Sequence, residues 1–158
     1  MKLYHGSEKQ ITTDTIKEGY FHGMFFSYTK EDAVGLASPK FLYSTEIEES
    51  DIIDASSFIY DDVSWETIKN KYGENAELLG DLISGERIIW DGLDDDEMNI
   101  VEKTFPTADG NAEIDWMIQK AAAEIADTLG YKAVEVQDEH GASVIVLPGN
   151  TIKLEGEI

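Results

Sequence analysis

Leu3-Tyr4-His5-Gly6-Ser7 opens the chain, and Gly23-Met24-Phe25-Phe26-Ser27-Tyr28 follows about twenty residues later. In the first stretch a short apolar run leads into a His-Gly-Ser step, and in the second an aromatic run ends at another serine. Each stretch predicts a short strand, over residues 2–4 and 24–26, that delivers polar side chains at its end. The rest of the chain must supply the neighbours of these two strands.

The chain has 158 residues, of which 42% are hydrophobic, and it has no cysteine. This length predicts a single domain, residues 1–158, with enough apolar side chains for a buried core. The lack of cysteine excludes disulfides, thiolate metal sites and a cysteine nucleophile. The chain does not open with a basic segment before an apolar stretch, and its apolar runs are short. We therefore expect a cytoplasmic protein with neither a signal peptide nor a membrane span.

The formal net charge is −21. A surface this acidic repels nucleic acid and anionic membranes, so we expect no direct contact with either. It attracts basic proteins, including those that bind DNA or RNA. The charge can steer the protein to a basic target, can inhibit such a target by imitating nucleic acid, or can serve solubility alone. Composition by itself favours solubility.

Periodicity, caps and turn residues predict the remaining elements. Strands are expected over residues 41–47, 52–54, 131–137, 142–147 and 151–154, and helices over residues 30–37, 64–72, 75–84, 94–104 and 116–129. Asp115 is the expected cap of the last helix, and Gly130 lies where that helix should end. The sequence therefore predicts an α+β fold with a helical insertion at residues 63–105 and strand pairings that are distant in sequence.

His5, Gly6 and Ser7 are the first candidates for chemistry. A nicotinamide carboxamide both donates and accepts hydrogen bonds, and a backbone that offers one N–H and one C=O satisfies both. Gly6 lets such a backbone approach closely, while the His5 imidazole and the Ser7 hydroxyl can hold ribose hydroxyls. The tripeptide alone is more typical of a structural strand end and turn.

The aromatic stretch supplies the second set of candidates. Oxidised nicotinamide is a planar cation, and an aromatic face attracts such a cation by roughly 0.5–2 kcal/mol. Phe25 is more typical of a core strand. Phe26, Tyr28 and the nearby Tyr20 are candidates to stack on the ring, and Ser27 lies between two of them.

Asp138 and Glu139, in a predicted turn before Gly141, are the catalytic candidates. Cleavage of the N-glycosidic bond of NAD passes through an oxocarbenium-like transition state, which a fixed carboxylate stabilises. In a chain with 33 Asp and Glu residues, a solvated acidic turn is the simpler interpretation of this motif by itself. The histidines and acids lack the spacing of metal ligands, so we predict no metal site.

Taken in order, these three pieces resemble the diphtheria-toxin-like branch of the ADP-ribosyltransferases. Residues 3–7 match its first motif and residues 23–27 its second, and residues 130–134 and 144–148 resemble its last strands. The layout, including residues 43–53, resembles the phage anti-CRISPR proteins that ADP-ribosylate a type I-F CRISPR surveillance complex. The resemblance covers about the first sixty and the last forty-five residues.

The chain departs from the family pattern at the positions of two stacking tyrosines and of a glutamate in the last catalytic strand. They are occupied by Phe26, by Leu36 or Ala37, and by Ala142 or Ser143, respectively. The carboxylate must then come from the preceding turn. The anti-CRISPR proteins place an aspartate in that turn, which favours Asp138 over Glu139.

The resemblance implies a mono-ADP-ribosyltransferase with the diphtheria-toxin-like fold, in which two small sheets form a cleft for the co-substrate NAD. The implied target is a basic, DNA-binding Cas subunit of a type I CRISPR surveillance complex in the bacterial host cytoplasm. Its modification would block binding of target DNA. Two alternatives stay open: a non-enzymatic acidic DNA mimic that inhibits a nucleic-acid-binding protein, and a toxin-like transferase aimed at an unrelated host protein.

Overall fold

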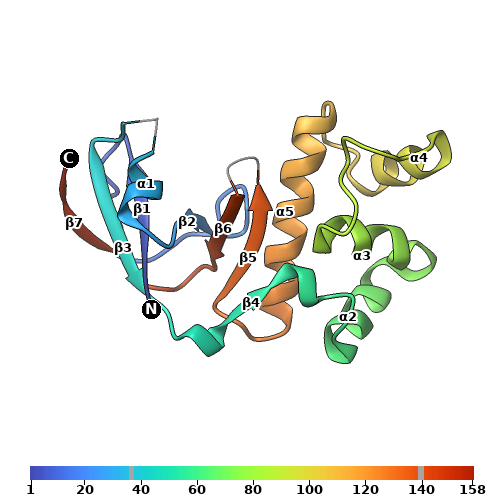
Figure 1. The fold of residues 1–158 in the computed structure, drawn as a ribbon, viewed down its shortest axis with the longest axis horizontal. Coiled ribbons are helices and arrows are strands. Elements are labelled where there is room, and N and C mark those ends of the chain that lie inside the picture. The colour runs from blue at the N-terminus through green and yellow to red at the C-terminus, as the bar shows by residue number, and fades with distance from the viewer. Residues whose placement is uncertain (36–37, 139–140) are drawn as a thin grey trace.

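The computed structural model describes residues 1–35, 38–138 and 141–158, and of Asp138 it describes only the backbone. Within this part of the chain two sheets and five α-helices are arranged along one long axis (Figure 1). One sheet has the order β1-β3-β7, with β1 Lys2–Ser7, β3 Phe41–Glu46 and β7 Lys153–Glu157. The other has the order β2-β6-β5-β4, with β2 Met24–Phe26, β6 Gly141–Val146, β5 Ala133–Asp138 and β4 Ile52–Asp54. The helices are α1 Lys30–Val34, α2 Asp62–Tyr72, α3 Ala76–Ser84, α4 Asp95–Thr104 and α5 Asn111–Thr128.

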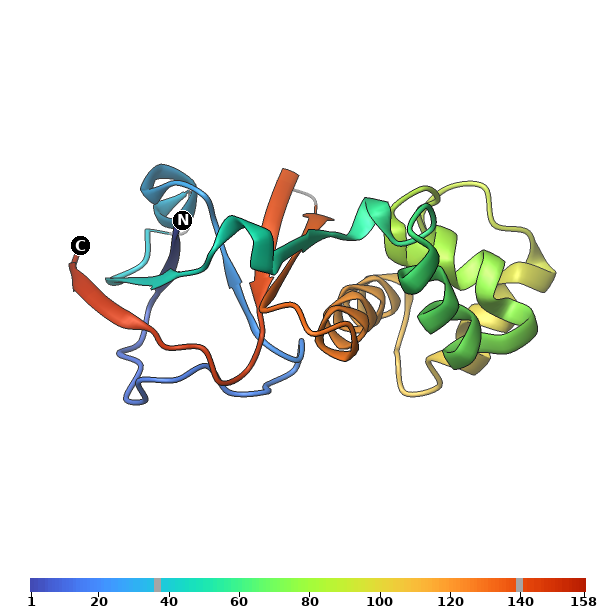
Figure 2. The same ribbon diagram turned by 90° about the horizontal axis from the view of Figure 1, so that it is seen from below.

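The elements form successive layers (Figures 1 and 2). Helix α5 lies against the four-stranded sheet, and α2, α3 and α4 lie on its far side. The three-stranded sheet occupies the opposite end of the molecule. Among the described residues, no helix is both long and apolar enough to cross a bilayer.

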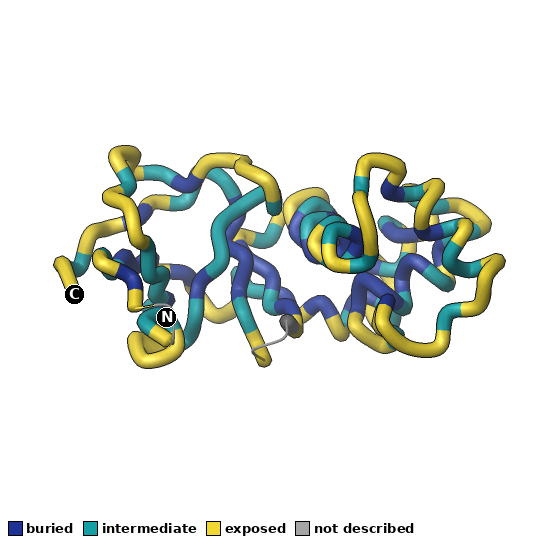
Figure 3. The backbone as a smooth tube through the Cα atoms, turned by 90° about the horizontal axis from the view of Figure 1, so that it is seen from above, coloured by how far each residue is buried: buried dark blue, intermediate teal, exposed yellow. Residues whose placement is uncertain are grey.

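Two hydrophobic clusters separate at the four-stranded sheet, because successive side chains of a strand point to opposite faces. In β6, Val144 and Val146 belong to the smaller cluster between the two sheets, whereas Ile145 belongs to the larger cluster around α5. Figure 3 shows buried backbone on both sides of this sheet. The alternation explains how one short strand serves two cores.

The helix ends follow local chemistry and correct two expectations. Helix α1 stops at Gly35, whose φ of 47° suits glycine, so it is shorter than the expected residues 30–37. Residues 36–37 lie outside the described part of the chain. Helix α5 begins four residues before Asp115, with Gly110 at the N-cap position, so Asp115 is not the cap. Ile114 is buried and extends the apolar face by a turn, and the Asp109 N–H donates to Glu113 Oε2 at 2.8 Å.

The strands differ from expectation where their partners are distant in sequence. Strand β1 continues to Ser7, because its whole length pairs with β3, from Lys2 opposite Glu46 to Ser7 opposite Phe41. The last strand is β7, later than the expected residues 151–154, and Thr151 instead forms an isolated bridge with Thr15. Helices α2, α3 and α4 each begin within two residues of their predicted starts.

Candidate active site

A backbone bridge joins the two sheets where Tyr4 of β1 pairs with Ser27, the residue after β2. The Tyr4 N–H donates to the Ser27 carbonyl at 2.9 Å, and the Ser27 N–H donates to the Tyr4 carbonyl at 2.7 Å. If this antiparallel register continued, Gly6 would lie opposite Phe25 and the strands would form one sheet.

The His5 side chain interrupts that register. His5 Nδ1 lies 2.6 Å from the Phe25 carbonyl oxygen and donates to it, so this acceptor is already satisfied. The His5 and Phe26 ring centroids are 5.6 Å apart. The imidazole therefore fills the place of a backbone pairing, and β1 and β2 part beyond Tyr4.

Gly6 presents its backbone at this parting. Backbone groups of alternate residues in a strand point to the same edge, so the Gly6 N–H and C=O lie on the edge that Tyr4 uses toward Ser27. A Cβ at Gly6 would lie 2.4 Å from the Ala33 carbonyl oxygen and 2.5 Å from Pro39 Cγ. Packing by α1 and Pro39 thus requires glycine at this position whatever binds beside it.

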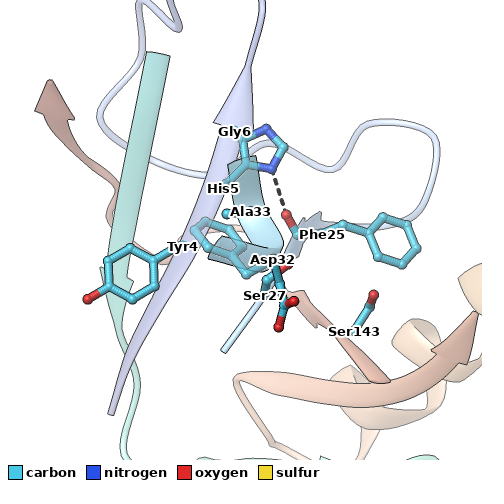
Figure 4. Close-up of a pocket in the computed structure, with 9 residues that line it drawn as sticks. Tyr4, His5, Gly6, Phe25, Ser27, Asp32, Ala33 and Ser143 are labelled. Atoms are coloured by element: carbon cyan, nitrogen blue, oxygen red, sulfur yellow. Dashed lines mark hydrogen bonds between the residues drawn. The ribbon is translucent and has the colours of Figure 1, made fainter. Parts of the chain in front are cut away.

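A pocket of about 180 Å³ opens where the strands part, and we name it the junction pocket (Figure 4). Its lining comes from β1, from β2 and the residue after it, from α1 and from β6: Tyr4, His5, Gly6, Phe25, Phe26, Ser27, Asp32, Ala33 and Ser143. Extending the β2–β6 register by one residue places Ser27 opposite Ser143, so the two hydroxyl-bearing residues come from neighbouring strands. Segments from both ends of the chain therefore build this pocket.

Burial controls the charge of the pocket histidine. Desolvation lowers the pKa of His5 and outweighs the opposing effect of its hydrogen bond to the Phe25 carbonyl. The ring is therefore neutral at pH 7, with a proton on Nδ1 and a lone pair on Nε2. A neutral imidazole of this tautomer can accept a hydrogen bond from a hydroxyl group.

The junction pocket brings together four of the seven predicted cofactor-binding residues: His5, Gly6, Phe26 and Ser27. Phe26 is only 2% exposed, so it offers a ligand little more than its edge.

Ser7 and Tyr20 do not line the pocket. The Ser7 hydroxyl donates to the Lys9 carbonyl at 2.6 Å in a local turn. Tyr20 lies on the α5 side of β2, where its ring packs edge-on against Trp116. The prediction that an aromatic side chain stacks on nicotinamide does not determine which face of the sheet the ring of a loop tyrosine packs against.

Tyr28 belongs to a neighbouring cluster rather than to the junction pocket. Its hydroxyl donates to Glu135 Oε1 at 2.5 Å, and Glu135 shares a hydrogen bond with Asp54. The Tyr28 bond lowers the pKa of Glu135, but burial and the nearby Asp54 outweigh it, so the pKa of Glu135 is raised. Burial raises the pKa of Tyr28, and Glu135 adds to this effect.

For the two catalytic candidates, Asp138 and Glu139, the structure describes only the backbone of Asp138. Glu139 lies outside the described residues, and so does the Asp138 side chain. The backbone of Asp138 ends β5 opposite Gly141, two residues from Ser143 along β6. Among the described residues, no group of three or more His, Asp or Glu side chains could hold a metal ion.

Sequence reasoning missed Asp32 and Ser143 as pocket residues. Asp32 is the acid at the third position after Thr29, whose hydroxyl caps α1 by accepting from the Asp32 N–H at 3.1 Å. The capping pattern predicts the helix start but not that the same acid faces a cleft. The available signal for Ser143 was the family's glutamate position, which the sequence places at Ala142 or Ser143.

Comparisons with known proteins show what this chain is similar to. A family model described as anti-CRISPR type I-F ADP-ribosyltransferase AcrIF11 matches residues 1–155. A solved structure, described as a crystal structure of an anti-CRISPR protein, is 25% identical with a TM-score of 0.66, and the match covers 98% of this chain and 94% of that one. No curated protein matches the chain. The chain belongs to the anti-CRISPR type I-F ADP-ribosyltransferase family AcrIF11.

Proposed function

We propose that this NAD-dependent enzyme transfers ADP-ribose to a DNA-binding Cas subunit of a type I CRISPR surveillance complex, and that the nicotinamide end of NAD binds in the junction pocket. The parting of β1 and β2 at the Tyr4–Ser27 bridge is the observation that carries this proposal. It leaves a polar cleft between two small sheets, as the diphtheria-toxin-like fold requires. We interpret helices α2 to α4 as an insertion into that single domain.

The size and polarity of the junction pocket suit one end of a dinucleotide. Pockets that bury a whole drug-sized ligand measure about 300–1,000 Å³, whereas this one measures about 180 Å³. It can enclose a nicotinamide ring, while the remainder of NAD would extend over the surface. Lys30 Nζ lies 5.7 Å from the ring centroid of Tyr4, a pocket residue, and is a candidate to pair with the pyrophosphate.

Backbone and hydroxyl groups would hold the nicotinamide and its ribose. The Gly6 N–H and C=O, at the edge where β1 and β2 part, would pair with the carboxamide, which needs one acceptor and one donor. The lone pair on His5 Nε2 would accept from a ribose hydroxyl, and the Ser27 hydroxyl is a second ribose candidate. The role of His5 uses the neutral tautomer that its bond to the Phe25 carbonyl fixes.

NAD, when bound, supplies an ADP-ribosyl group whose bond to nicotinamide breaks with the electron pair leaving on nicotinamide. A carboxylate of this chain would stabilise the positive charge that develops on the ribose while a side chain of the target forms the new bond and loses its proton. Asp138 remains our candidate, because β5 ends there beside the strand that carries Ser143. Asp32 is a second candidate, since it lines the pocket.

Modification would prevent DNA binding by the target. ADP-ribose adds a bulky pyrophosphate with two negative charges, and such a group on a DNA-contacting surface repels phosphates and blocks close approach. The match to an ADP-ribosyltransferase family favours an enzyme over a stoichiometric DNA mimic. An enzyme would inactivate many complexes per protein molecule.

The test incubates the protein with NAD and the purified type I-F surveillance complex and measures the mass of each Cas subunit. We expect one subunit to gain the mass of ADP-ribose at a substoichiometric amount of protein, together with release of nicotinamide. Unchanged subunit masses with wild-type protein would overturn the proposal. Inhibition that needs equimolar protein and ignores NAD would support the mimic instead.

His5→Asn is a suitable variant for this assay, because asparagine keeps an N–H donor for the Phe25 carbonyl but lacks the lone pair of Nε2. We expect it to fold and to bind NAD more weakly. Gly6→Ala is unsuitable, since the clash with Ala33 and Pro39 would disturb folding.

A further inference from the structure

The loop between α3 and α4 exposes two large apolar side chains. Ile88 is 53% exposed and Trp90 is 61% exposed. Ile88 also bridges Asp91, so both residues belong to one tight turn. Exposed apolar side chains that gather into one patch are typical of interaction sites. Tryptophan in particular is enriched among the residues that dominate protein interfaces.

Arg87 holds this loop in a fixed conformation. Its guanidinium pairs with both carboxylate oxygens of Glu97, with Nη2 to Oε1 at 3.1 Å, and Nη2 also donates to the Gly92 carbonyl at 2.8 Å. The Arg87 bond lowers the pKa of Glu97 to about 2, so the pair stays charged at neutral pH. A loop ordered before binding loses less conformational entropy when a partner docks.

A groove leads from this loop toward the β5–β6 hairpin. Its lining includes Ile88 and Ile89 of the loop, Ile118 of α5, and Val136 and Gln137 of β5. Gln137 directly precedes Asp138, our catalytic candidate. A protein seated on the loop and groove would therefore extend toward the hairpin on which the proposed transfer depends.

The charge around the loop identifies the kind of partner that fits. Residues 86–97 contain six acids and one arginine, and the arginine is paired with Glu97. Glu86 and Asp91 flank the apolar pair and are exposed. Proteins that bind nucleic acid carry Lys and Arg to neutralise phosphates. A basic surface with an apolar spot complements an apolar pair ringed by acids.

We propose that Ile88, Trp90 and the adjoining groove form the docking surface for the Cas target, separate from the junction pocket. This inference rests on the proposed function for the identity of the partner. Ile88 and Trp90 anchor the complex, and the surrounding acids steer a basic surface toward it.

The experiment compares wild type with Ile88→Ser/Trp90→Ser, using the purified type I-F surveillance complex as the probe. We expect the KM for the complex to rise by roughly tenfold or more, with kcat nearly unchanged, because only docking is weakened. The thermal shift caused by NAD should stay as in wild type, which verifies folding. Tyr60→Ser/Val63→Ser, which removes two apolar side chains that are even more exposed, near the start of α2, is the matched control and should keep the wild-type KM.

A binding assay without NAD makes the outcomes distinct. Weaker capture of the complex by Ile88→Ser/Trp90→Ser supports the docking surface even if wild type transfers no ADP-ribose, in which case only the proposed function fails. Equal capture by wild type and variant overturns the docking surface, and so does a KM unchanged from wild type. Glu86→Lys/Asp91→Lys should slow association and flatten its dependence on salt, and an unchanged salt dependence contradicts the steering role.

Discussion

The sheet half of the molecule, made of the two sheets and α1, differs from the helical half, made of α2 to α5. In the sheet half β1, β2, β3, β5 and β6 all contribute buried side chains to the smaller core, and the strands come from both ends of the chain. In the helical half most contacts are between neighbours in sequence, and the helices begin at local caps such as Asp61 and Asp94. The first arrangement yields a polar pocket, and the second yields a packed core with an exposed acidic surface.

The difference teaches where function can reside in a small domain. A cleft with backbone groups available to a ligand arises where two sheets stop pairing, since helices satisfy their own backbone. A projecting loop with exposed side chains arises where helices turn. We therefore assign the chemistry to the sheet half and recognition of the target to the helical half.

The largest expected effect comes from emptying each core. Phe26→Ala and Phe58→Ala each remove a nearly fully buried ring and should lower the free energy of unfolding by about 3–5 kcal/mol in urea denaturation. Only Phe26→Ala should abolish the thermal shift caused by NAD, because Phe26 lines the junction pocket. If either variant fails to fold, the corresponding leucine variants allow the same comparison. Loss of the NAD response in both would refute the division between the halves.

Next in size is the loss of the carboxylate that we propose to be catalytic. Asp138→Asn should slow transfer about 100-fold while the Kd for NAD changes little, since the carboxylate acts on charge that develops in the transition state. Nicotinamide release measures the rate. Asp32→Asn serves as the comparison and should slow transfer less than tenfold. The reverse order would assign the role to the pocket acid on α1.

A smaller effect is expected from the cap of α4. The Asp94 carboxylate accepts from the Glu97 N–H at 2.8 Å, and Asp94→Ala should cost about 1 kcal/mol of unfolding free energy. The affinity for NAD should not change, because this cap lies in the helical half. Asp95→Ala, which removes only a charge near the helix start, should cost less than the cap variant. Equal costs would show that charge rather than capping matters there.

The smallest expected effect is a pH dependence of stability due to His5. Burial lowers its pKa in the folded state, so as the pH falls below about 6.5 the unfolded chain takes up a proton that the folded chain does not. Stability therefore falls with acidification, and the loss continues down to the pKa of the folded state. Between pH 7 and pH 5 the Tm of wild type should drop further than that of His5→Asn. Parallel curves would mean that His5 is not buried neutral.

Local signals predict the helical half well. The acids that open residues 94–104 suit a helix start, and the structure places a capping box there, with both hydrogen bonds between Asp94 and Glu97 present. The predicted start of α5 was wrong. Asp115 is suited to capping and is the expected cap, whereas the helix begins earlier because Ile114 is buried. Caps identify an available helix end, whereas packing selects the end that is used.

The sheet half was predictable only in part. The sequence motifs identified His5, Gly6 and Ser27, which the structure brings to one pocket. The place of Ser143 in the pocket depends on the pairing of β2 with β6, which are more than a hundred residues apart. No local signal indicated that Tyr20, in a loop, would pack against Trp116 of α5. The sequence suggested that position 6 is glycine so that its backbone can approach nicotinamide. The close approach of Ala33 to Gly6 is a second reason for glycine at this position.

The junction pocket combines residues 4–6, 25–27 and 143. The ribosome therefore makes its first parts early in translation and its last part near the end. Strand β3 has its second neighbour only once residues 153–157 emerge, while α2 and α3 can pack as soon as they are made. Domain elements that wait for a late partner fold last. A nascent chain of this protein would thus carry an ordered helical segment well before it could bind a nucleotide, and a prematurely terminated product would be inactive although partly structured.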